Sequence, residues 1–451
     1  MTATSGASHE LAPAEALEVL RKRILVDGFE IVMDLQASHG MYLHDALTGR
    51  EFLDFYGFFA SQPVGFNHPR LSDPDFQARL LTAARTKVAN SDVYTTFYAE
   101  FVRTLDEIAA PDGFEHFFFI DGGALAVENA LKVAFDWKVR RNLAAGRGEI
   151  GSQVIHFRRA FHGRSGYTLS LTNTADPRKT QYFPKFDWPR IDNPAIDFSL
   201  DEPRRTEDVA ARERQALDQI RAAIDERGHD IAAVIIEPIQ GEGGDNHFRG
   251  EFLGELRRIC DEHEILLIFD EVQTGVGITG RMWACEHFDV YPDILVFGKK
   301  MQICGLMANR RIDEVPDNVF RVPSRINSTF GGNLADMVRA TQYLRIIAEE
   351  NLVNNAATCG QRLLEGLCRL AADHDGVTAP RGRGLFCAFD LPDGDFRNRV
   401  RQLCYDRGML VLPCGERSLR FRPMLDVSAD DIDRGLEILD EALRIAAGGG
   451  E

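Results

Sequence analysis

The sequence predicts an α/β protein with a large, mostly parallel sheet domain and a smaller α+β domain. Between residues 117 and 297, short apolar runs alternate with segments of helical periodicity, which is the pattern of a parallel sheet flanked by helices. From about residue 355 onward, short strands and helices are mixed. The length of 451 residues also suits two or three domains better than one.

The N-terminal segment, residues 1–70, is expected to pack with the C-terminal domain. Helical periodicity predicts a helix from Pro13 to Val26, and short apolar runs predict strands at 31–35, 41–44 and 51–55. Aromatic residues and glycines follow without a clear period. We therefore expect a wall of aromatic side chains there rather than a regular element.

The large domain is expected to span residues 71–335. Short apolar runs predict its buried strands, at 117–120, 154–157, 232–237, 266–269 and 294–297. Helical periodicity predicts helices at 207–227 and 250–264, and a longer helix, 334–352, would carry the chain away from this domain. The predicted α+β domain, residues 336–451, contains a strand at 384–391, a helix at 395–408, short strands near Leu410 and Leu419, and a last helix at 428–447.

Composition narrows the class of protein. The net charge is −17, so phosphate backbones repel the chain and nucleic acid is excluded as a partner. No apolar run is long enough to span a membrane, and no secretory leader is recognisable at the start of the sequence. The eight cysteines include no CxxC pair, so we predict free thiols, no metal site and a cytoplasmic location.

An acid and a pair of lysines, which have complementary chemistry, follow two of the predicted strands. Asp270 follows the strand 266–269, and Lys299 and Lys300 follow the strand 294–297. Ligands of open α/β sheets bind at this edge. Pyridoxal phosphate requires a lysine that holds its aldehyde as a Schiff base and an acid that keeps its pyridine nitrogen protonated. The spacing therefore favours a pyridoxal phosphate site.

Two other interpretations of this stretch stay open. Gly275, Gly277 and Gly280 spell the GxGxxG of a dinucleotide site, although DEVQT separates them from the end of the strand. Alternatively, the aspartate caps a loop and the two lysines form a solvated surface pair.

Further segments add possible contacts to a cofactor. Gly122 and Gly123 stand between a strand and a helix, where unpaired N–H groups and the helix dipole favour a phosphate. Phe161 and His162 precede a glycine, so that an aromatic ring could lie flat against a cofactor. Arg164 follows on the same loop, with a solvated surface arginine as the alternative interpretation.

Together these motifs resemble the class III (omega) aminotransferases, which are fold-type I pyridoxal phosphate enzymes. The resemblance runs from about residue 30 to the end and implies a seven-stranded-type sheet. Within the family, the likeness is greatest to the branch that acts on lysine. The matching segments are DEVQTGVGITG at 270–280, PDILVFGKK at 292–300, IIEPIQGEGG at 235–244, FHGR at 161–164 and LRFRP at 419–423.

The resemblance implies a role for each matching residue of the cofactor site. Lys299 would form the Schiff base, with Lys300 as the alternative, and Asp270 would pair with the pyridine nitrogen. Thr329 would reach the phosphate in the other subunit, so the family's homodimer is expected. The implied cofactor contacts are Gly123, Ala124, Phe161, His162, Asp270, Val272, Gln273, Lys299 and Thr329.

The resemblance also implies a substrate site. Arg164 would grip the carboxylate far from the reacting amine, and Arg420 would receive the α-carboxylate of 2-oxoglutarate. Glu242 would cover Arg420 while an ω-amino substrate is bound, and then swing away. Asn327 stands where 4-aminobutyrate enzymes tend to place an aromatic residue, and an amide there could bond an extra ammonium group. Gln273 completes the implied set.

The reaction implied by the resemblance is transfer of the ε-amino group of L-lysine to 2-oxoglutarate. The expected products are glutamate and a 6-semialdehyde that cyclises. 4-Aminobutyrate and ornithine are the alternative amino donors. One departure from the family concerns the phosphate turn, which is GGALA here in place of a polar SGSEA-like segment, so backbone N–H groups must serve.

Overall fold

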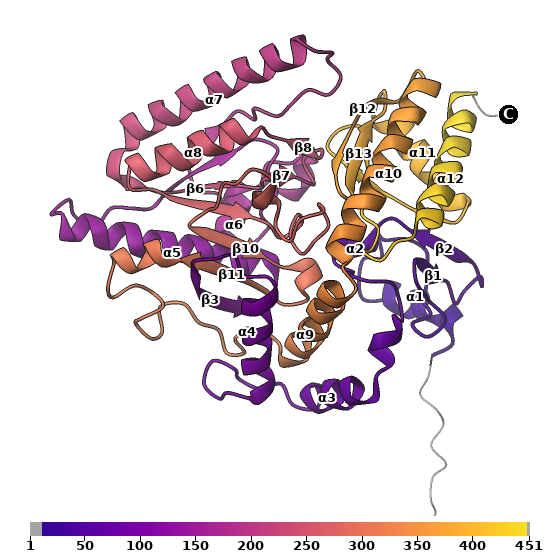
Figure 1. Ribbon diagram of the computed structural model, residues 1–451, viewed down its shortest axis with the longest axis horizontal. Coiled ribbons are helices and arrows are strands. Elements are labelled where there is room, and N and C mark those ends of the chain that lie inside the picture. Colours follow the sequence, from indigo (N-terminus) through magenta and orange to yellow (C-terminus); the bar gives the residue numbers. More distant parts are fainter. Residues whose placement is uncertain (1–10, 449–451) are drawn as a thin grey trace, which may run out of the picture.

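A seven-stranded sheet organises the larger part of the molecule. The computed structural model describes residues 11–448. In Figure 1 the part built on this sheet lies beside a second part, which the C-terminal residues form. The strand order is β3-β11-β10-β9-β6-β4-β5. Neighbouring strands from β10 to β5 run parallel, whereas β11 runs antiparallel to β10 and to β3. The strands are β3 (Phe114–Ile120), β4 (Gln153–Phe157), β5 (Arg190–Ile191), β6 (Ile231–Ile236), β9 (Leu266–Asp270), β10 (Ile294–Phe297) and β11 (Cys304–Asn309).

Both faces of this sheet are covered, which explains why its central strands are continuous apolar runs. Ile268 and Val296 face one core with helix α5, whereas Phe269 and Phe297 face the opposite core with α4, α8 and α9. Successive residues of a strand point to opposite faces, so each strand contributes to both cores. The helices of this part are α3 (Pro74–Ala84), α4 (Thr96–Ile108), α5 (Gly123–Ala144), α6 (Gly166–Leu171), α7 (Arg204–Arg227), α8 (Gly250–Glu262) and α9 (Leu334–Glu349).

The C-terminal part builds a separate four-stranded antiparallel sheet with the order β12-β13-β16-β15. It appears in orange and yellow in Figure 1, with its helices beside the sheet. Its elements are α10 (Leu352–Asp373), β12 (Thr378–Arg383), β13 (Phe386–Asp390), α11 (Gly394–Asp406), β14 (Met409–Leu410), β15 (Leu412–Cys414), β16 (Ser418–Phe421) and α12 (Ala429–Ala447).

The N-terminal segment joins the C-terminal part through strand pairing. Strand β2 (Glu51–Asp54) pairs with β1 (Tyr42–His44) on one side and runs parallel to β14 on the other. Helix α1 (Pro13–Arg21) precedes these strands, and α2 (Gly57–Ala60) follows them. Residues 1–10 of the predicted 1–70 segment lie outside the described residues. The domain boundaries at residues 70 and 335 stay a prediction.

Three sequence-based expectations for the elements differ from the structure. The helix expected over 13–26 ends at Arg21. The strand expected at 31–35 is wrong, because Asp34 accepts hydrogen bonds from the N–H groups of Gln36 and Ala37 and turns the chain there. The helix expected over 334–352 ends at Glu349, since Asn351 has a φ of 53° and starts a new helix, α10.

A short hairpin between the two parts carries the segment IQGEGGDNH. Strands β7 (Ile239–Gln240) and β8 (Asn246–His247) pair antiparallel, and residues 241–245 form the turn that joins them. Within residues 11–448, no helix is both long and apolar enough to cross a membrane.

Candidate active site

A cavity of about 500 Å³ lies at the C-terminal ends of the central parallel strands. Asp270 ends β9, and Lys299 follows β10, its parallel neighbour in the sheet. The prediction that these two strands are parallel neighbours is therefore confirmed. The cavity is lined by Ser61, Gly123, Ala124, Phe161, His162, Gly163, Glu237, Asp270, Val272, Gln273, Lys299, Gln302 and Cys304.

Lys299 lines the cavity, whereas Lys300 does not. Burial, followed by the nearby charge of Arg420, lowers the pKa of the Lys299 amine to about 8. Lys300 is only 2% exposed, and its Nζ donates to the carbonyl oxygens of Ala60 and Gln273, both at 3.0 Å. The interpretation of the two lysines as a solvated surface pair is therefore wrong.

The carboxylate of Asp270 is held in place by two hydrogen bonds. Its Oδ2 lies 2.7 Å from Nδ1 of His162, and its Oδ1 accepts from the N–H of Val272 at 3.1 Å. His162 is in turn held through its N–H, which donates to Oγ1 of Thr172. Oriented in this way, the carboxylate is suited to pair with a protonated ring nitrogen.

The N-terminus of helix α5 borders the same cavity. Gly122 precedes the helix with a φ of 99°, a backbone conformation that favours glycine, and it offers no side-chain cap. The N–H groups of the first helical turn are therefore left for another acceptor, and the helix dipole favours an anion there. Gly123 and Ala124 stand at this end of the helix and line the cavity.

Glu237 lines the cavity, although the sequence analysis assigned it no role. Its two carboxylate oxygens accept from the N–H groups of Phe161, at 2.9 Å, and Gly241, at 3.1 Å. Burial raises the pKa of this carboxyl to about 7. An acid that directly follows a buried apolar strand was the signal that could have identified it.

Two arginines converge on the side chain of Gln273. Its Oε1 accepts from Nη1 of Arg420 at 3.0 Å and from Nε of Arg422 at 3.1 Å. Arg422 is fully buried and forms an ion pair of 2.5 Å with Asp245 in the β7–β8 turn. Because the amide oxygen is engaged by two cations, the amide nitrogen of Gln273 is left to donate elsewhere.

The structure brings some predicted site residues together and leaves others apart. Glu242 is paired with Lys179, a residue that the sequence analysis did not single out. Arg164 is exposed and does not line the cavity. Asn327 and Thr329 are exposed as well, and neither lines the cavity of its own chain.

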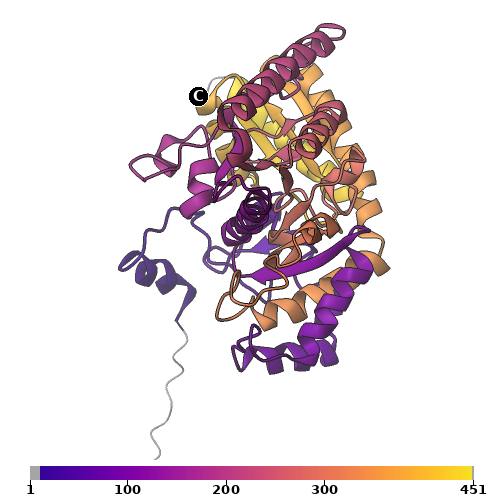
Figure 2. The ribbon, with the colours of Figure 1, turned by 90° about the vertical axis from the view of Figure 1, so that its left-hand side faces the viewer.

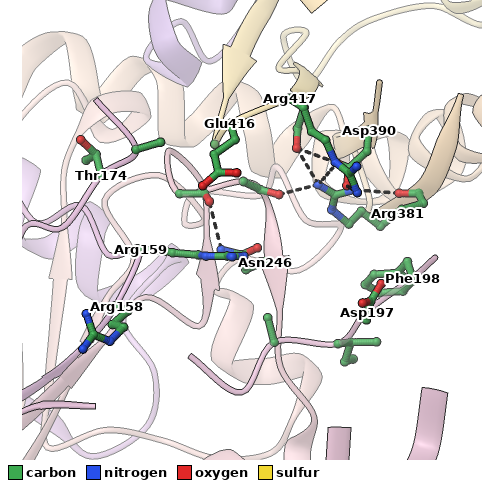
Figure 3. A pocket seen from close by; sticks show the side chains of 18 of the residues that line it. Arg158, Arg159, Thr174, Asp197, Phe198, Asn246, Arg381, Asp390, Glu416 and Arg417 are labelled. Atoms are coloured by element: carbon green, nitrogen blue, oxygen red, sulfur yellow. Dashed lines mark hydrogen bonds and ion pairs between the residues drawn. The ribbon is translucent and has the colours of Figure 1, made fainter. Parts of the chain in front are cut away.

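A larger cavity, of about 770 Å³, is lined in part by Gly243, Gly244 and Asn246 of the β7–β8 hairpin (Figure 3). Five of its charged residues are paired among themselves. Arg381 bonds Asp390 at 2.8 Å, Arg417 lies 3.6 Å from the same carboxylate, and Arg212 lies 3.5 Å from Asp197. Neither Lys299 nor Lys300 lines this cavity, whereas Lys299 lines the cavity of about 500 Å³ together with Asp270.

The glycines of the GxGxxG segment are packed against protein. A Cβ at Gly275 would lie 2.4 Å from the ring of Trp283, and one at Gly280 would lie 2.9 Å from Cβ of Ala357. At Gly277 the nearest atoms belong to Val353 and Leu425. These glycines therefore permit close packing of the chain, and the dinucleotide interpretation is wrong.

The smaller cavity fits pyridoxal phosphate on the chemistry of its donors. It combines a half-buried amine of lowered pKa, an oriented carboxylate, an aromatic residue and a helix N-terminus for a phosphate. The buried Nε2 of His162 has no partner among the described residues, so a polar ligand could still bond there. A group with an aldehyde, a ring nitrogen and a phosphate would satisfy these features together.

Comparison with known proteins settles the family. The family model described as aminotransferase class-III matches residues 26–443. This chain belongs to the class III aminotransferases. Its cofactor is pyridoxal 5′-phosphate, and its fold is that of the fold-type I pyridoxal phosphate enzymes. The expectations for family, fold and cofactor are confirmed.

Within the family, the curated relatives include several lysine enzymes. The L-lysine-epsilon aminotransferase of Mycobacterium tuberculosis is 53% identical over 442 residues, which cover 97% of each chain. The corresponding enzyme of Streptomyces clavuligerus is 48% identical over 95% of this chain and 94% of its own. The human mitochondrial 4-aminobutyrate aminotransferase is 31% identical over 92% of this chain and 86% of its own.

Solved structures agree with the sequence comparison. The lysine aminotransferase from M. tuberculosis, in its internal aldimine form, matches with a TM-score of 0.94 and 53% identity. The match covers 97% of this chain and all of the other. An ornithine aminotransferase from Toxoplasma gondii, at 24% identity and a TM-score of 0.78, shares the fold.

Proposed function

We propose that this aminotransferase moves the ε-amino group of L-lysine to 2-oxoglutarate, giving glutamate and a 6-semialdehyde that cyclises. The observation that carries the proposal is the identity of 53% to a lysine ε-aminotransferase over nearly the whole chain, against 31% to a 4-aminobutyrate enzyme. The oriented Asp270 and the amine of Lys299, with its lowered pKa, support the same class of reaction.

Lys299 and Asp270 carry the chemical steps in this proposal. When bound, pyridoxal phosphate supplies an aldehyde that condenses with amines and a ring that accepts electrons from the substrate carbon. Asp270 keeps the ring nitrogen protonated, which makes the ring a better electron acceptor. The amine of Lys299, whose pKa is lowered to about 8, would take the proton from the substrate carbon and pass it to the cofactor carbon that carries the aldehyde.

Two arginines bind the substrate carboxylates in this proposal. Arg164 holds the carboxylate that is remote from the reacting amine, and Arg420 holds the α-carboxylate of 2-oxoglutarate. A planar guanidinium binds a carboxylate through two parallel hydrogen bonds. Burial of Arg420, which is only 4% exposed, strengthens this contact but makes an uncovered arginine costly. Glu242 is the group that would cover it.

The active unit in this proposal is a homodimer. Asn327 and Thr329 are exposed on their own chain, which suits contacts to the substrate and phosphate of the partner's site. Helix α1 buries none of its residues against its own chain and stands away from the body (Figure 2). The apolar side chains that follow it, including Leu25 at 84% exposure, suit packing on a second subunit.

The cytoplasm is the proposed location. All eight cysteines are free thiols, which is the usual state in a reducing compartment.

The amino donor is tested by mixing the cofactor-loaded protein with one amine at a time and following the absorbance of the cofactor. L-Lysine should convert the cofactor to its amine form faster than equal concentrations of ornithine or 4-aminobutyrate. Faster conversion by 4-aminobutyrate would overturn the choice of donor, together with the role of Asn327, and would leave the family and cofactor intact.

A further inference from the structure

The ion pair between Glu242 and Lys179 joins two residues that lie 63 positions apart in the sequence. The side chains are about 20% and 30% exposed, respectively. Oε2 of Glu242 is buried and has no partner among the described residues, and the same holds for Nε of Arg420. One carboxylate oxygen and one guanidinium N–H are therefore left unpaired.

The backbone that carries Glu242 is fixed by the C-terminal part. The N–H of Gly415 donates to the carbonyl of Glu242 at 2.8 Å, and Arg381 donates to the carbonyls of Gly244 and Asp245 at 2.6 and 2.9 Å. Only the side chain of Glu242 is thus left free to change its partner.

Close packing at Gly243 restricts the backbone of the β7–β8 turn further. A Cβ at Gly243 would lie 1.9 Å from the carbonyl oxygen of Arg159, a residue that borders the cavity of Figure 3. The turn therefore packs tightly against the segment that carries Arg159.

Besides Lys179, a second cation, Arg420, is connected to the turn that carries Glu242. Arg420 and Arg422 are two positions apart along an extended segment, so they point to the same side, and both donate to Oε1 of Gln273. Asp245, in the turn that carries Glu242, pairs with Arg422. The turn that carries Glu242 is thereby linked to Arg420 through Arg422 and Gln273.

We propose that Lys179 is the holding partner of Glu242 when Glu242 is turned away from Arg420. Lys179 is then a positioning residue that keeps Arg420 free for the carboxylate of 2-oxoglutarate. The inference rests on the proposed roles of Arg420 and Glu242. Lys179 does not line the cavity. The proposal therefore means that a residue outside the cavity affects the binding of 2-oxoglutarate.

The position of Lys179 is set by its own short turn. Residues Pro177–Lys179 form a single 3-10 turn, and the carboxylate of Asp176 caps it by accepting from the N–H of Arg178 at 3.1 Å. The N–H of Gln181 donates back to the carbonyl of Pro177 at 2.9 Å. Because the backbone of Lys179 is held by these hydrogen bonds, only its side chain loses conformational entropy when it pairs with Glu242.

The test is Lys179→Met, which keeps the length of the side chain and removes its charge. The KM for 2-oxoglutarate should rise about two- to fivefold, the range expected for a partly exposed ion pair. The KM for L-lysine should not rise, because Glu242 would then favour Arg420, as the first half-reaction requires. Lys179→Arg should restore the KM for 2-oxoglutarate.

Lys185→Met is the matched control, since Lys185 lies on the same loop and its Nζ bonds the carbonyl of Thr180 instead of a carboxylate. It should leave both KM values unchanged. In a Glu242→Gln background, Lys179→Met should add no further effect. An unchanged KM for 2-oxoglutarate, equal changes in both half-reactions, or an effect that persists without the glutamate would overturn the proposal.

The acceptor half-reaction is measured on protein whose cofactor has been converted to the amine form by L-glutamate, so it involves no lysine. If L-lysine failed as the amino donor, the proposed function would be overturned. The effect of Lys179→Met on the KM for 2-oxoglutarate could still be measured. Conversely, normal lysine kinetics with no change in Lys179→Met would overturn only the role of Lys179.

Discussion

At the scale of single residues, two adjacent lysines have different environments that the sequence does not distinguish. Lys299 lines the cavity, whereas Lys300 donates hydrogen bonds to two backbone carbonyls. The family resemblance favoured Lys299, but only the structure shows where each amine lies. The pairing of Glu242 with Lys179 was equally out of reach, because it depends on how two distant loops meet.

Replacing Lys299 by alanine should abolish turnover. The loss should be at least the factor of about 10²–10⁴ that general acid–base help provides. Borohydride reduction followed by peptide mass analysis should find the cofactor attached to residue 299 in the natural protein and to no residue in Lys299→Ala. Lys300→Met is the control and should keep the attached cofactor; attachment at residue 300 would contradict the assignment.

The pKa of Lys299 predicts how cofactor loading depends on pH. The pKa is lowered from 10.5 to about 8, mainly by burial and next by Arg420. Only the unprotonated amine attacks an aldehyde, so the loading rate of the cofactor-free protein should fall as the pH drops below about 8 and level off above it. Arg420→Met removes a nearby positive charge, which should move the midpoint to higher pH. If the midpoint of the pH dependence stayed the same in Arg420→Met, the charge of Arg420 would not be a cause of the lowered pKa of Lys299.

At the scale of elements, the sequence was most informative where an element is buried on both sides. The runs 266–269 and 294–297 are strands because no polar face is needed between two helical layers. The expected strand at 31–35 failed because the turn-forming side chain of Asp34 competes with strand pairing. The break at Asn351 depends on a left-handed backbone that periodicity does not reveal.

The turn that carries Glu242 should tolerate no side chain at Gly243. In Gly243→Ala, the Cβ would meet the carbonyl of Arg159, so the turn must shift. We expect a loss of about 1–3 kcal/mol in the free energy of unfolding, measured by denaturant titration. Gly254→Ala is the control, because nothing lies within 4 Å of its Cβ and alanine favours the interior of α8. Equal stability of the two variants would contradict the close packing.

At the scale of the whole molecule, a site shared between subunits should allow inactive variants to complement each other. In the proposed homodimer, Thr329→Asp would place a negative charge beside the cofactor's phosphate in the partner's site, and Lys299→Ala would remove the amine from its own site. In a hybrid dimer, one site receives Lys299 from one subunit and Thr329 from the other. Dissociated and reassociated mixtures should regain about a quarter of the natural activity, as random pairing of two-fold dimers requires.

Each variant taken alone through the same dissociation should stay inactive. Mixtures that regain nothing, although sedimentation shows hybrid dimers, would contradict the placement of Thr329 in the partner's site. The sequence alone could suggest this arrangement only through the family resemblance, since exposure of Thr329 becomes visible only in the folded chain.

The identity of the migrating nitrogen tests the central claim most directly. L-Lysine labelled with heavy nitrogen at the ε-position only would be incubated with 2-oxoglutarate and the cofactor-loaded protein, and glutamate analysed by mass spectrometry. The proposed function predicts that the label appears in glutamate while a cyclised product accumulates. Unlabelled glutamate, with the label retained in a 2-oxo acid, would show that the α-amino group reacts and would contradict the account.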